Sequence, residues 1–156
     1  MQRSGVSFIL ALLCLLFIGF PQTASSQDIR EETLLISFGN RQFEVELYEN
    51  NATNSLLQSL PQTIDMSAWG DEFYGKLGQA VNYDGDNQKD VFEVGEVALW
   101  PSGNALCIFF GPTPVSVKGE PRMASPGVAF GKIKGDTSAL KGLGGMLQGV
   151  KLDIKR

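Results

Sequence analysis

The chain has 156 residues, a net charge of −4, no histidine and no block of basic residues. A negative chain without a basic patch binds phosphate backbones and anionic lipid surfaces poorly, so we expect no nucleic acid partner and, once the N-terminal segment is removed, no membrane association. The missing histidine removes the usual general base, the common serine and cysteine triads and most zinc sites. We therefore expect no metal and no other cofactor, and we leave enzymatic activity uncertain.

The first 26 residues have the order of a cleavable secretory signal. Arg3 precedes an apolar run over residues 6–20, and Ala24 and Ser26 supply the small residues of a cleavage site. We therefore expect a signal peptide over residues 1–26 and a secreted or periplasmic protein. Two alternatives stay open, an uncleaved membrane anchor and lipidation of Cys14, although the run is shorter than the roughly 18 residues of a spanning helix.

The rest of the chain is long enough for one domain with a core and too short for two. We expect a flexible polar leader over residues 27–32 and a single domain over residues 33–156. That domain contains Cys107 alone among cysteines, so it forms no internal disulfide. Because Cys107 lies between Leu106 and Ile108, we expect it to be buried and unreactive.

The first predicted elements are a hairpin and a helix. Residues 33–38 and 42–48 flank a turn at 39–41, and the second run alternates apolar with polar side chains, which is typical of a strand with one wet face. Residues 50–53 offer capping side chains before leucines at helical spacing, and Pro61 ends the pattern. This predicts a short amphipathic helix.

The middle of the chain is less regular. Residues 63–77 are apolar without a clean period. Residues 82–93 form a polar loop whose oxygen-bearing side chains fall at the spacing of a calcium-binding loop: Asn82, Asp84, Asp86, Asp90 and Glu93. The flanks are typical of strands and not of helices, so both interpretations stay open, a hairpin loop and a calcium site.

A second hairpin is predicted over residues 97–110. Two β-favouring runs, 97–100 and 105–110, flank Pro101-Ser102-Gly103-Asn104, whose Pro and Gly suit a turn. The second run is apolar at successive positions, so both of its faces should be covered. The following Gly-Pro-Thr-Pro corner over residues 111–114 should end the strand, because two prolines remove two ladder donors.

The C-terminal third is expected to add short strands over residues 115–117, 128–133 and 149–154, with one helical turn over 138–143. No internal repeat or interdomain linker is visible.

The motifs of this chain are similar to those of the small prokaryotic cyclophilin-like domain proteins. The similarity lies in residues 95–106, in 109–114 with Ser116, and in 131–133, and it continues upstream through 43–47, 51–53, 60–61 and 69–75. The resemblance covers roughly residues 33–156. It implies a mainly β fold, a closed cyclophilin-like β-barrel with one main short α-helix, and it implies no established activity.

For function, we expect a non-catalytic module that binds a peptide or a small molecule in an aromatic-lined groove. The alternative is a weak peptidyl-prolyl isomerase, since cyclophilins as a class grip a proline and offer an arginine to the amide, although the chain lacks a match to the histidine-bearing and glutamine-glycine-glycine segments of active cyclophilins. A purely structural role of the barrel surface is the third hypothesis. The candidate ligand-binding residues are Tyr74, Trp100, Phe110, Thr113 and Arg122.

Overall fold

The computed structural model describes residues 27–156, so the predicted signal over residues 1–26 lies outside the described part of the chain. The described residues form nine strands, one α-helix and two short 3₁₀ turns. They are β1 Ile29–Phe38, β2 Arg41–Tyr48, α1 Asn51–Gln58, β3 Gln62–Ala68, β4 Glu72–Lys76, β5 Lys89–Val91, β6 Glu96–Trp100, a turn at Pro101–Gly103, β7 Ala105–Phe109, β8 Arg122–Ile133, a turn at Ser138–Gly142, and β9 Met146–Ile154. None of the helices in this part has the length and apolar character needed to cross a membrane.

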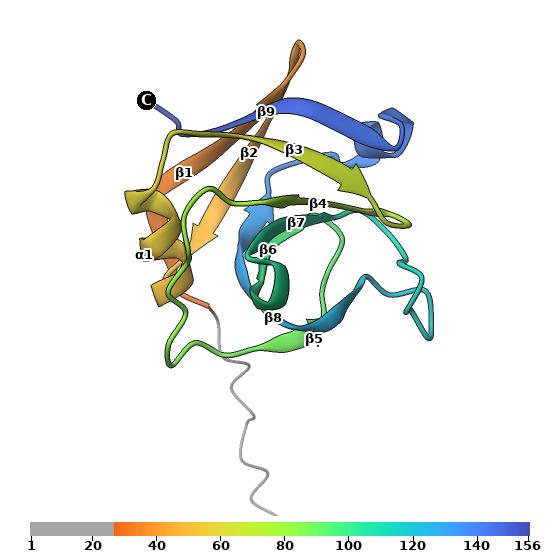
Figure 1. The fold of residues 1–156 in the computed structure, drawn as a ribbon, viewed down its shortest axis with the longest axis horizontal. Helices are drawn as coiled ribbons and strands as arrows, with labels where there is room; N and C mark the ends of the chain where they lie inside the picture. Colours follow the sequence, from red (N-terminus) through yellow and green to blue (C-terminus); the bar gives the residue numbers. More distant parts are fainter. Residues whose placement is uncertain (1–26) are drawn as a thin grey trace, which may run out of the picture.

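Eight of the strands close into an antiparallel barrel (Figure 1). Their order is β2-β1-β9-β3-β4-β7-β6-β8, and β8 returns to pair with β2. β5 lies outside this closure and pairs with the first half of β8. The prediction of a mainly β, closed cyclophilin-like barrel with one short α-helix is therefore confirmed.

The N-terminal hairpin and helix form as their patterns predict, but β1 begins at Ile29 and not at residue 33. Part of the predicted flexible leader over residues 27–32 therefore belongs to the strand, because Ile29 pairs with Tyr48 of β2. β1 pairs with β2 in a hairpin, and burial alternates over residues 44–48 of β2. Helix α1 begins where the Asn50 side chain accepts a hydrogen bond from the Thr53 amide, which satisfies an otherwise unpaired donor. Its apolar face places Ala52 and Leu56 in the main core.

Two apolar clusters cover the two faces of β7. Leu106 and Ile108 belong to the main core inside the barrel, whereas Cys107 and Phe109 belong to a second cluster on the outer face. The arm formed by β5 and the first half of β8 lies over this outer face and adds Met123 to the second cluster. The expectation that both faces of this apolar run are covered is confirmed.

The prediction of a strand over residues 115–117 is wrong. Ser116 Oγ accepts from the Thr113 amide at 2.8 Å and donates to the Glu120 carbonyl, while the Glu120 carboxylate accepts from the Val117 amide at 3.1 Å. These local bonds satisfy backbone groups that a strand would pair across a ladder. The segment is consequently a turn-rich loop, and Val117 is exposed.

Candidate functional site

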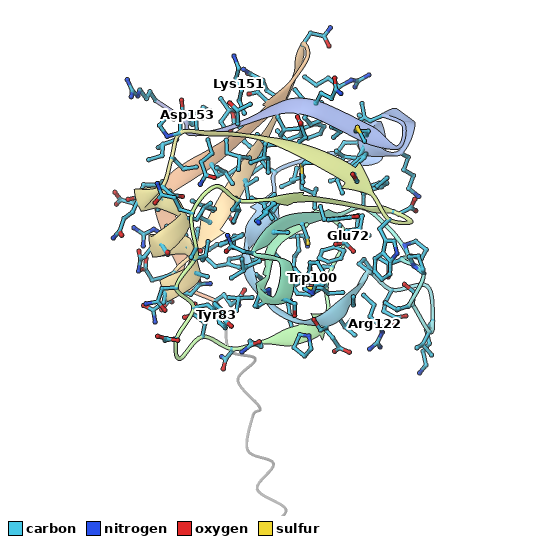
Figure 2. All side chains as sticks on the ribbon, viewed as in Figure 1. Glu72, Tyr83, Trp100, Arg122, Lys151 and Asp153 are labelled. Carbon is cyan, nitrogen blue, oxygen red and sulfur yellow. The ribbon has the colours of Figure 1, made fainter. Side chains whose placement is uncertain are left out.

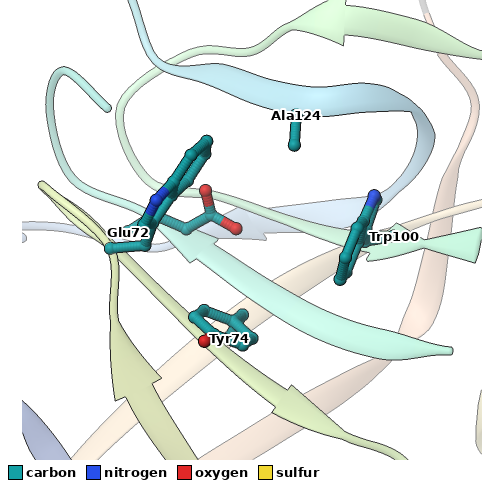
Figure 3. A pocket seen from close by; sticks show the side chains of 5 residues that line it. Glu72, Tyr74, Trp100 and Ala124 are labelled. Atoms are coloured by element: carbon teal, nitrogen blue, oxygen red, sulfur yellow. The ribbon is translucent and has the colours of Figure 1, made fainter. Parts of the chain in front are cut away.

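A cavity of about 210 Å³ lies on the outer face of the barrel wall. It is lined by five residues from the β3–β4 turn, β4, β6 and β8: Trp69, Glu72, Tyr74, Trp100 and Ala124. Figure 3 shows the Glu72 carboxylate pointing into the space bordered by Tyr74, Trp100 and Ala124. We call this the aromatic cavity.

The strand register places its floor. Glu72 and Tyr74 lie opposite Phe109 and Cys107 in the β4–β7 pair, so all four side chains project from the same, outer face of the sheet. In Figure 2 Glu72 and Trp100 lie beside one another on this wall. An alternating strand therefore delivers a carboxylate and a phenol two residues apart to one side of the barrel.

Trp100 is fixed at the end of β6 from two directions. Its indole Nε1 donates to Ser125 Oγ of β8 at 2.8 Å. A β-carbon at Gly103 would lie 2.5 Å from Cζ3 of the Trp100 ring, so the ring packs where only glycine leaves room. The Pro101–Gly103 turn thus holds one wall of the cavity.

The Gly-Pro-Thr-Pro corner supports the opposite wall. The Asp71 amide donates to the Pro112 carbonyl at 2.8 Å, and the Phe110 amide donates to the Asp71 carbonyl at 2.9 Å. The Trp69 amide donates to the Glu72 carbonyl at 2.8 Å and closes the β3–β4 turn. The corner therefore anchors the turn that carries Trp69.

Glu72 is the unusual group of the cavity. Its side chain belongs to a residue that is only 4% exposed, and its Oε2 is buried without a hydrogen-bond partner among the described residues. Burial raises the pKa of this carboxyl from its ordinary 4.5 to about 7, against the smaller opposing effect of a hydrogen bond with the Cys107 thiol. Burial and the neighbouring Glu72 in turn raise the pKa of Cys107 well above its ordinary value.

The cations near the second cluster have other partners. Arg122 pairs with Asp90 and with Glu120, its Nε lying 2.8 Å from Glu120 Oε1. Lys89 donates to both oxygens of the buried Glu96, at 2.8 and 2.9 Å. The lining of the aromatic cavity accordingly contains one ionisable acid and no lysine or arginine.

The structure brings together two of the five candidate residues predicted from the sequence. Tyr74 and Trp100 line the cavity. Phe110 packs against Phe73 in the main core, with ring centroids 5.1 Å apart. Thr113 is buried, and its Oγ1 donates to the backbone carbonyl of Arg122. The Arg122 guanidinium pairs with Asp90 and Glu120 and does not line the cavity.

Sequence reasoning missed Trp69 and Glu72. The available signal was a pair of adjacent acids, Asp71 and Glu72, between aromatic residues in a segment with no clear period. Alternation along β4 would have paired Glu72 with Tyr74 on one face, but the strand boundaries were needed to use it.

Three of the four carboxylates in the predicted polar loop have separate partners. Both oxygens of Asp86 accept from backbone amides at the start of α1, Asn51 at 3.0 Å and Ala52 at 2.7 Å. Asp90 pairs with Arg122, and Glu93 pairs with Lys132. Within residues 27–156 no group of three or more acidic, cysteine or histidine side chains is arranged to hold a metal ion.

Comparison with known proteins identifies the family. The search of curated proteins gives no match. Among solved structures, the solution structure of the hypothetical protein AF2241 from Archaeoglobus fulgidus is similar, with 34% sequence identity, a TM-score of 0.67, and coverage of 83% of this chain and 98% of that chain. The family model described as Cyclophilin-like matches residues 32–148. The chain, with its closed barrel and its matched motifs, belongs to the Cyclophilin-like family.

Proposed function

We propose that this domain is a non-catalytic binding module that holds part of a small molecule, or one side chain of a peptide, in the aromatic cavity. The observation that carries the proposal is the convergence of three aromatic residues on one buried, unpartnered carboxylate oxygen. A concave apolar site with a few convergent polar groups is the usual form of a ligand pocket. A buried polar atom without a partner is costly, and a ligand that supplies one offsets this cost.

The size of the cavity restricts what enters it. At about 210 Å³ it is smaller than the roughly 300–1,000 Å³ of pockets that enclose drug-sized ligands. A head group or a single side chain fits this volume, with the rest of the ligand outside. Tyr74 is 37% exposed and Ala124 is exposed, so the cavity has an opening toward solvent.

The placement of Arg122 favours binding over the isomerase alternative. An isomerase of the cyclophilin kind offers a guanidinium to the reacting amide. Arg122 instead pairs with Asp90 and Glu120. A proline tetrapeptide assay separates the two functions, because only an isomerase accelerates the cis to trans conversion.

Tryptophan fluorescence offers a direct test of binding. The chain has two tryptophans, Trp69 and Trp100, and both line the cavity. Tryptophan emission therefore reports on this site. We expect at least one probe from a panel of small alcohols, amides, carboxylates and ammonium compounds to change the emission saturably.

The matched variants are Tyr74→Leu and Tyr83→Leu. Tyr74 lines the cavity, whereas Tyr83 packs against the main core. The response should be lost in Tyr74→Leu and kept in Tyr83→Leu. An equal response in both variants, or no response to any probe in the parent protein, would contradict the proposal.

We further propose that the domain is exported. The support is the order of Arg3, the apolar run and the small residues before position 27. Mass spectrometry of the protein recovered from outside the cytoplasm should find a chain that begins at Gln27. Recovery of an intact Met1 there would contradict cleavage.

A further inference from the structure

We propose that the aromatic cavity selects an organic cation, an alkylated ammonium group held against Glu72 and among Trp69, Tyr74 and Trp100. This inference rests on the proposed binding function and names the chemical class of the ligand.

Glu72 is buried and lacks a cationic partner among the described residues. A carboxylate buried to this extent is normally paired with a cation or saturated with hydrogen bonds. Here Oε2 has neither within the described residues, although the side chain faces an open cavity. A positive ligand group supplies the missing charge and removes the main penalty on the ionised acid.

The walls of the cavity are mostly aromatic. Trp and Tyr rings attract cations through the negative potential of their faces, and several such rings around one site are the form in which proteins recognise quaternary ammonium groups. Three of the five lining residues are Trp or Tyr. The same walls contribute apolar area, which a neutral ligand would also use, so the carboxylate is what distinguishes a cation.

The lining of the cavity contains no lysine or arginine that would compete with a cationic ligand. Arg122 and Lys89, the basic residues of the covering arm, pair with Asp90, Glu120 and Glu96. The chain as a whole carries a net charge of −4, which favours the approach of a cation. An anionic ligand would meet an acid with no counter-charge beside it.

An alkylated ammonium group suits the cavity better than a bare one, because the lining has few polar groups. A bare ammonium is a compact, strongly hydrated charge that loses its water on entry. The cavity lining offers one carboxylate as a charged acceptor, so the remaining donors of a bare ammonium would be poorly satisfied. Methyl groups replace those donors with apolar contacts to the rings and to Ala124.

The test compares choline with its neutral isostere, 3,3-dimethylbutan-1-ol, on the full chain by tryptophan fluorescence and calorimetry. The two probes share shape and hydroxyl group and differ in charge. We expect choline to bind at least about tenfold more tightly. In Glu72→Gln this difference should disappear, and in Glu44→Gln, which removes an equal charge from an exposed carboxylate of β2 outside the cavity, it should persist.

The pH dependence gives a second readout. Choline keeps its charge at every pH, whereas Glu72 must lose its proton to attract it, so affinity should rise as pH increases through about 7, the pKa of the unliganded acid. The titratable groups around Glu72 are the Cys107 thiol on β7, whose pKa lies well above this window, and the Tyr74 phenol on β4. The carboxylate of Asp71, in the adjacent turn, faces Lys141, with Oδ2 3.8 Å from the lysine Nζ. Affinity for the neutral isostere should not rise over the same window.

A further binding experiment identifies the source of the cation. A short peptide with one trimethyllysine is compared with the same peptide carrying unmodified lysine and with choline. Tighter binding of the trimethyllysine peptide than of choline supports the inference and assigns the ligand to a protein side chain; the reverse order supports it and assigns a free small molecule.

The results that overturn the inference differ from those that overturn the proposed function. If the isostere binds as tightly as choline, or if folded Glu72→Gln retains the preference, the cation inference fails while binding stands. The same holds if only neutral or anionic probes bind. If no probe binds at all, both fail. Since the comparison of choline with its isostere uses the unaltered protein, it decides the matter even if Glu72→Gln does not fold.

Discussion

Among single residues, Glu72 most directly links stability to pH. A carboxyl whose pKa is raised on folding lowers stability as pH rises from its unfolded pKa to its folded pKa, because only the folded state holds the proton in that range. Glu120 acts in the opposite sense: backbone amides and Arg122 hold its pKa at about 2, so its contribution is lost only as pH falls below about 4. The two residues therefore affect different pH ranges.

We predict that the free energy of unfolding falls between pH 4.5 and 7 by at most roughly 3 kcal/mol on account of Glu72. Below this window both states hold the proton, within it only the folded state does, and above it neither does, so the decline ends near pH 7. Urea unfolding at stepped pH measures the effect. Glu72→Gln should flatten the decline, and an unchanged slope in that variant would place its cause elsewhere.

Cys107 should be chemically inert in the folded protein. It is fully buried, and burial together with Glu72 raises its pKa, so the reactive thiolate is scarce. In a chain carrying Cys14→Ser, a thiol reagent should label Cys107 slowly without denaturant and rapidly with it. Fast labelling of the native chain would show that the outer face of β7 is accessible.

Among the elements, β8 makes the largest number of pairings. Its second half lies between β2 and β6 and closes the barrel, while its first half pairs with β5 and contributes Ala124 to the cavity. Close approach of backbones makes the closure possible, since a β-carbon at Gly131 would lie 2.1 Å from the Glu46 carbonyl oxygen. Glycine at this position is a requirement of packing.

We expect Gly131→Ala to destabilise the fold by about 1 to 3 kcal/mol, because the added methyl group must push β8 away from β2. Gly142→Ala is the matched control, since a β-carbon there meets nothing within 4 Å. Thermal unfolding of both variants gives the comparison. Equal melting temperatures would mean that β8 can move away from β2 at this contact without a loss of stability.

Some of the elements could be predicted from the sequence, whereas the cavity could not. Alternation in β2, the capping pattern of α1 and the apolar run of β7 follow from local chemistry, and each is confirmed. The cavity depends on register between β4 and β7 and on a corner that supports the β3–β4 turn, which are contacts between distant segments. This is why Tyr74 and Trp100 could be named as candidates while Trp69 and Glu72 were not. Phe110 and Arg122 look equally suitable in sequence, but Phe110 packs into the main core and Arg122 pairs with Asp90 and Glu120.

At the scale of the whole molecule, two apolar clusters share one sheet. The main core fills the barrel, and the second cluster fastens the β5–β8 arm to its outside through Phe92 and Phe109, whose rings stack 4.7 Å apart. The arm has one short ladder, between β5 and β8, and is joined to the barrel by these contacts and by side-chain bonds such as Lys89 to Glu96 and Trp100 to Ser125. Each barrel strand, by contrast, has ladders on both of its sides. The arm should therefore open at a lower free energy than the barrel.

We predict that amides of residues 122–125 exchange with solvent at least about tenfold faster than those of residues 128–133, although both belong to β8. Hydrogen exchange followed by mass spectrometry or NMR measures both halves in one experiment. Uniform protection along β8 would show that the arm and the barrel open as one unit.

The division of β8 has a consequence for how such a barrel can diverge in evolution. Glu72, Tyr74 and Trp100 are carried by strands that the barrel itself holds, whereas Ala124 and Ser125 belong to the arm. Substitutions in the arm can reshape the roof of the cavity without entering the main core. Under the proposed binding function, related chains can therefore accept groups of different size above the same acid and rings. The shape of the cavity and the stability of the barrel thus depend largely on different parts of the fold, although one continuous strand contributes to both.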